Sequence, residues 1–105
     1  MRESYIDFKL DFGKLLSAGT FPNSLNLGKA TPKGSIKCES AGSGTLLTVT
    51  AKKTESDDGI TRTSSFYNGT AEIFFDEQLK DYPLLSAAVT GTGPFFCYID
   101  VKSGE

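Results

Sequence analysis

The sequence predicts an all-β protein, a small antiparallel β-sandwich or barrel of six to eight short strands with at most one short helix near residues 76–82. Stretches of alternating apolar and polar residues recur at roughly ten-residue spacing, as in such folds. Glycine, proline, asparagine and aspartate separate these stretches. With 105 residues, 38% of them hydrophobic, the chain is expected to form one domain over residues 1–105 that buries a real core.

The N-terminal third combines one clear strand with an irregular segment. Residues 5–12 alternate, which places four apolar side chains on one face: Ile6, Phe8, Leu10 and Phe12. We expect Gly13 to end this strand and residues 14–18 to form a single helical turn. Residues 20–34 contain too many prolines and glycines for a long element, but Leu25 and Leu27 could face inward from a short edge strand.

The middle of the chain is predicted to form three strands joined by turns. A strand at 35–40 is expected to turn through 41–44, as a hairpin, into a strand at 45–53. Asp58-Gly59 then leads into a strand at 60–67. The inward residues predicted for these strands are Ile36, Cys38, Leu47, Val49 and Ala51.

Asn68-Gly69 predicts a two-residue type I′ turn, because both residues tolerate positive φ. Such a turn fixes the register of the strands it joins. Counting outwards from it gives four expected cross-strand pairs: Tyr67 with Thr70, Phe66 with Ala71, Ser64 with Ile73, and Arg62 with Phe75.

The C-terminal third is expected to hold the short helix and two strands. Asp76 can cap a helix over 76–82, which Pro83 prevents from extending. Strands follow at 84–90 and 94–102. The last strand should turn one face to the core, with Phe95, Cys97, Ile99 and Val101, and the other away from it, with Phe96 and Tyr98.

Composition excludes several kinds of chemistry. The chain contains no histidine, which removes Ser-His and Cys-His nucleophiles and the commonest general base. Two cysteines without histidine cannot form a usual structural zinc site. A carboxylate pair for glycoside hydrolysis stays a minor alternative. We therefore expect a non-enzymatic protein without metal or cofactor.

Cys38 and Cys97 are both predicted to face inward. One interpretation is a disulfide that ties two sheets together across the core. The other, which we favour because no secretion signal is visible, is a pair of reduced thiols that act as small hydrophobic side chains.

The candidate binding residues are aromatic side chains that the core assignment leaves on outward faces: Phe74, Phe96, Tyr98 and Tyr67. Large exposed apolar patches are uncommon on monomers and usually serve binding. The competing expectation, which we favour, is that the irregular segment over 14–34 folds across these rings and buries them.

An open aromatic face would suit a protein partner or self-association, in a structural or accessory module such as a viral particle protein or an inhibitor. A free edge strand could serve the same role. The first alternative is an OB-like single-stranded nucleic-acid binder, disfavoured by the net charge of −2 and the pI near 5.1. The second is a carbohydrate-binding sandwich, weakened by the absence of tryptophan. No membrane association is expected, and the cytoplasm is the default location, with a secreted mature domain as the alternative.

Overall fold

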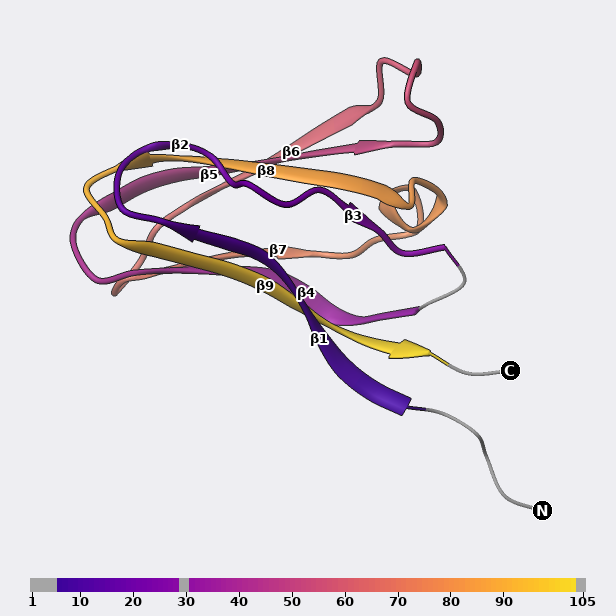
Figure 1. Cartoon of the computed structure of the whole chain (residues 1–105), viewed down its shortest axis with the longest axis horizontal. Helices are drawn as coiled ribbons and strands as arrows, with labels where there is room; N and C mark the ends of the chain where they lie inside the picture. Colours follow the sequence, from indigo (N-terminus) through magenta and orange to yellow (C-terminus); the bar gives the residue numbers. More distant parts are fainter. Residues whose placement is uncertain (1–5, 29–30, 104–105) are drawn as a thin grey trace.

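The computed structural model describes residues 6–28 and 31–103 and forms two packed antiparallel sheets (Figure 1). Tyr5, which the sequence placed in the first strand, lies outside the described residues. Sheet A has the strand order β1 (Ile6–Leu15), β9 (Phe95–Ser103), β4 (Thr31–Ser40) and β7 (Thr70–Phe74). Sheet B has the order β2 (Gly19–Thr20), β8 (Leu84–Gly91), β5 (Gly44–Lys52) and β6 (Ile60–Ser65), and β3 (Leu25–Asn26) also pairs with β8.

The predicted small β-sandwich is therefore confirmed. Two of the nine strands in the described residues are only two residues long, which accounts for the excess over the six to eight expected. In place of the predicted helix the chain makes one 3-10 turn, η1 (Leu79–Asp81). The N-cap position of this turn is Gln78, whose side chain makes no capping bond, but the Asp76 carboxylate accepts a hydrogen bond of 2.7 Å from the Leu79 amide at its start.

The core lies between the two sheets and contains most of the predicted inward residues. On the apolar face predicted for the first strand, Phe12 is fully buried, Leu10 is only partly buried and Phe8 is 37% exposed. Period-two alternation brings every second residue of each long strand to this interface. The buried residues from sheet A include Phe12, Ile36, Cys38, Ala71, Ile73, Phe95, Cys97, Ile99 and Val101, and those from sheet B include Leu25, Leu47, Val49, Ala51, Leu85, Ala87 and Val89. Phe66 and Phe75 are only partly buried against them.

The first strand continues past the residue expected to end it. Gly13, at φ 114°, instead forms a β-bulge after Asp11, and β1 then pairs with β9 as far as Leu15. The bulge is held from the side by Asn23, whose backbone amide donates to the Phe12 carbonyl at 2.9 Å. The helical turn expected at 14–18 is therefore wrong, because strand pairing to β9 supplies the backbone partners there.

The Asn68-Gly69 turn is confirmed locally but joins strands of different sheets. Both residues have positive φ, 52° and 82°, and Tyr67 pairs with Thr70. Beyond that pair the predicted register is wrong: β6 pairs with β5 over six residues, and β7 pairs with β4 over five. β6 and β7 each pair over a longer stretch with a strand of their own sheet, so they separate from each other after one bridge.

The 41–44 link is likewise a connection between sheets and not a hairpin. β4 belongs to sheet A and β5 to sheet B (Figure 1). Close packing against the link between β8 and β9 holds it there: a Cβ on Gly42 would lie 2.6 Å from the Thr92 carbonyl oxygen. The Ser40 hydroxyl also donates to that oxygen, at 3.0 Å.

Candidate functional site

The outer face of sheet A is built around β9, which lies between β1 and β4. Residues 96 and 98 point away from the core because their neighbours in the strand point into it. Directly opposite Phe96 lie Lys14 on one side and Glu39 on the other. Tyr98 lies between Asp11 and Lys37 in the same way. Each ring is therefore flanked by side chains of opposite charge.

The face is open, and the expectation that residues 14–34 cover it is wrong for the part of that segment the structure describes. Phe21, Leu25 and Leu27 are buried in the core, along the edge of sheet B. Among the four candidate rings, Phe74 is 66% exposed, Phe96 41% and Tyr67 80%, while Tyr98 is half-buried.

The four aromatic residues do not form one patch. Phe74 lies on β7, separated from β9 by the whole of β4, whose outward Lys37 and Glu39 stand between. Tyr67 lies in the turn beyond the other end of β7. Of the four, only Phe96 and Tyr98 lie close together. The candidate site is therefore limited to the part of sheet A around β9 and does not include Phe74 or Tyr67.

Two lysines from β1 complete this site. The Lys9 ammonium lies 4.5 Å from the centroid of the Tyr98 ring, and the Lys14 ammonium lies 5.4 Å from that of Phe96. Both distances are within the range of a cation–π interaction. Neither lysine was predicted from the sequence to belong to the site. Lys9 stood on the polar face of its strand, but nothing local to it indicated that β1 pairs with β9.

The Tyr98 hydroxyl is already engaged within the face. It donates a hydrogen bond of 2.9 Å to the Glu39 carboxylate. This bond, with partial desolvation and the Glu39 charge, raises the pKa of Tyr98 to about 12. Tyr98 is therefore a fixed, neutral ring at physiological pH, and its orientation is set before any ligand arrives.

A shallow hollow of about 240 Å³ opens beside the two rings. The hollow lies at the bulge in β1, where Phe12 is the extra residue between Asp11, which is opposite Tyr98, and Gly13, which is opposite Cys97. Its lining residues are Asp11, Gly13, Lys14, Phe96, Cys97 and Tyr98. The volume falls below the ~300–1,000 Å³ typical of small-molecule sites, so it suits one side chain of a larger ligand.

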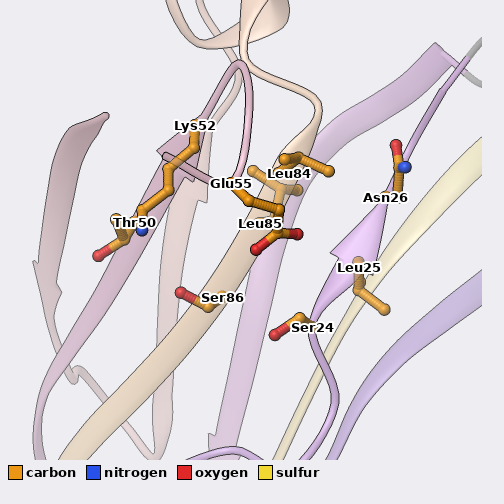
Figure 2. Close-up of a pocket in the computed structure, with 9 residues that line it drawn as sticks. All are labelled: Ser24, Leu25, Asn26, Thr50, Lys52, Glu55, Leu84, Leu85 and Ser86. Atoms are coloured by element: carbon orange, nitrogen blue, oxygen red, sulfur yellow. The ribbon is translucent and has the colours of Figure 1, made fainter. Parts of the chain in front are cut away.

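A second hollow, of about 220 Å³, lies on the outer face of sheet B. Figure 2 shows side chains from β3, β5 and β8 around it, with Glu55 reaching in from the loop after β5. Its lining residues are Ser24, Leu25, Asn26, Thr50, Lys52, Glu55, Leu84, Leu85 and Ser86. They include one carboxylate and no aromatic ring. The hollow thus lacks both a stacking platform and a carboxylate pair.

Cys38 and Cys97 lie directly opposite each other on β4 and β9. The interpretation that they link two sheets is therefore wrong, since both belong to sheet A. Both are buried free thiols in this structure. The hydrogen bond between them, together with burial, raises the pKa of Cys97.

The described ranges contain no group of three or more histidine, cysteine, aspartate or glutamate side chains arranged to hold a metal ion. Among the same residues, no helix is long and apolar enough to cross a bilayer. No protein-family model, curated protein or solved structure matches the chain.

Proposed function

We propose that this chain is a non-enzymatic binding module that recognises a protein partner through the outer face of sheet A around Phe96 and Tyr98. The observation that carries the proposal is the outward placement of the exposed Phe96 ring and the half-buried Tyr98 ring beside a hollow of side-chain size. Phenylalanine, tyrosine and methionine are enriched at the centres of protein interfaces, where they fill pockets on the partner.

The fixed orientation of Tyr98 supports this role. Its hydroxyl is hydrogen-bonded to Glu39 and its ring contacts the Lys9 ammonium, while the exposed Phe96 ring contacts the Lys14 ammonium. Side chains that are ordered before binding lose less conformational entropy when a partner docks. The surrounding charges, of both signs, suit the polar rim of an interface that selects its partner by charge pattern.

Each hollow contributes a single carboxylate, Asp11 in one and Glu55 in the other. Neither therefore offers the two facing carboxylates that glycoside hydrolysis uses. This supports the non-enzymatic part of the proposal and leaves binding as the function that the geometry favours.

Single-stranded nucleic acid is the second candidate, favoured by one specific observation. Lys9 and Lys14 stack on the two rings, which is the combination of cations and aromatic platforms that such binders use. Asp11 and Glu39 border the same rings, however, and would repel a phosphate backbone. A protein partner tolerates both signs of charge, so we rank it first.

The proposal is tested by comparing two serine variants in quantitative affinity capture from the native source. Phe96→Ser removes a ring at the hollow, whereas Phe74→Ser removes a more exposed ring two strands away and is the matched control. We expect the amount of captured partner to fall at least tenfold for Phe96→Ser and to stay at the wild-type level for Phe74→Ser. Equal retention by both variants would show that the face around β9 does not bind.

Two further measurements separate the kinds of partner. Light scattering after size exclusion, over a range of protein concentrations, shows whether the partner is a second copy of the chain. Titration with a labelled oligonucleotide at low salt tests the second candidate, because electrostatic binding is strongest there. Saturable oligonucleotide binding that Phe96→Ser abolishes would favour nucleic acid over protein.

A further inference from the structure

The two cysteines of the chain occupy positions that a disulfide can bridge. Cys38 and Cys97 are direct cross-strand partners in sheet A. Opposed residues of an antiparallel pair have Cα atoms about 4.5 or 5.5 Å apart, and disulfides join Cα atoms about 4.4–6.8 Å apart. Both side chains point into the core. The backbone therefore already has the spacing that the bond requires.

We propose that Cys38 and Cys97 are a disulfide modification site that links β4 to β9 inside sheet A as the chain folds. The oxidant is a disulfide compound such as oxidised glutathione. The thiolate of one cysteine attacks this compound and expels one glutathione thiolate, which leaves a mixed disulfide. The thiolate of the second cysteine then attacks the sulfur of the first cysteine in this mixed disulfide and expels the other glutathione thiolate. The protein loses two protons and two electrons, and one oxidised glutathione becomes two reduced molecules.

Burial determines when this bond can form. Both thiols are almost completely shielded from solvent, and β9 is an inner strand with β1 and β4 on either side. A bulky oxidant can reach them only before sheet A closes or after it opens. The bond is therefore a structural crosslink that forms during folding. In the native protein the thiols are oxidised slowly, and the bond, once formed, is reduced slowly.

The site bears on where the chain acts. Disulfides of this kind persist in secreted, periplasmic or surface proteins and are rare in the cytosol. A secreted mature domain is the alternative that the sequence left open. The crosslink would also close a loop of about 60 residues and so restrict the unfolded chain.

The test is refolding of the full chain from urea in a glutathione redox buffer, with a parallel sample in excess reductant. Each sample is then denatured, alkylated and weighed by intact mass spectrometry. We expect the oxidised sample to be a monomer with no alkylated cysteine, about 2 Da lighter than the unmodified reduced chain. The reduced sample should carry two alkyl groups. Its urea midpoint should rise by about 1 M or more over the reduced sample. The Cys38→Ala variant is the control, and its midpoint should not depend on the buffer.

Three results would overturn the proposal. The first is a refolded wild-type chain that still carries two alkylatable thiols in the oxidising buffer. The second is oxidation that produces only disulfide-linked dimers. The third is an oxidised monomer whose midpoint equals or falls below that of the reduced protein. A separate arm adds the same buffer to the folded, reduced protein. If the folded protein is oxidised as fast as the refolding chain, the disulfide does not depend on folding for its formation, and that part of the proposal is refuted.

Discussion

Phe95 and Phe96 are neighbours in the sequence but point to opposite sides of β9, so truncating each one separates the core from the candidate face. Phe95 is fully buried and packs against Phe66, with ring centroids 6.2 Å apart. Phe95→Ala should therefore cost about 3–5 kcal/mol of unfolding free energy, because it removes a buried ring and leaves a cavity.

Phe96→Ala should cost much less. The ring keeps 41% of its surface exposed, so its removal opens no enclosed cavity. The loss consists of partial burial and of the contact with Lys14, which is worth about 0.5–1 kcal/mol at an exposed site. We expect a total of about 1–1.5 kcal/mol.

The assay is urea denaturation followed by circular dichroism on both variants and the wild type. A difference of about 2 kcal/mol or more separates the two midpoints by roughly 1 M when the m-value stays constant. Equal losses for the two variants would refute the assignment of faces. A loss of 3 kcal/mol or more for Phe96→Ala would show that its ring is covered and not available to a partner.

Three further predictions concern the core, the face and the bulge. Ile73→Ala should cost about 2–5 kcal/mol, because the side chain is buried in sheet A; a urea midpoint close to wild type would place Ile73 outside the core. In an ultraviolet titration Tyr98 should ionise near its raised pKa of about 12, and Glu39→Gln should return that pKa toward 10. Because the folded-state pKa of Tyr98 is raised, the stabilisation by its hydrogen bond is complete below pH 10 and is lost as the pH rises toward 12. If Tyr98 titrates equally in the wild type and in the Glu39→Gln variant, the hydrogen bond to Glu39 is not the cause of the raised pKa. Gly13→Ala should cost about 1–3 kcal/mol, since φ is 114° and the new Cβ would lie 2.6 Å from Cγ of Pro22; unchanged thermal unfolding would show that the bulge adapts without strain.

The alternation of the sequence by itself predicted most of the residues that face the core, although it placed the exposed Phe8 on the same face as the buried Phe12. It separated Phe95 from Phe96 and placed Ile36, Ile73 and Ile99 inside, as the structure bears out. This was possible because the two-residue period of a strand is a local property that holds whichever strand lies alongside. The Asn68-Gly69 turn was readable for the same reason, since its backbone angles depend only on those two residues.

Strand pairing was decided only by the tertiary structure. The strands on either side of Asn68-Gly69 join different sheets because each finds a longer partner elsewhere in the chain. Pairing of β1 with β9 brings Lys9 and Lys14 to the two rings, and pairing of β4 with β9 places Cys38 opposite Cys97. These partners lie far apart in the sequence, and their pairing depends on how the whole set of apolar faces is best buried. The inward faces thus follow from the local alternation of residues, whereas the candidate site and the cysteine pair depend on which strands lie side by side in the sheet.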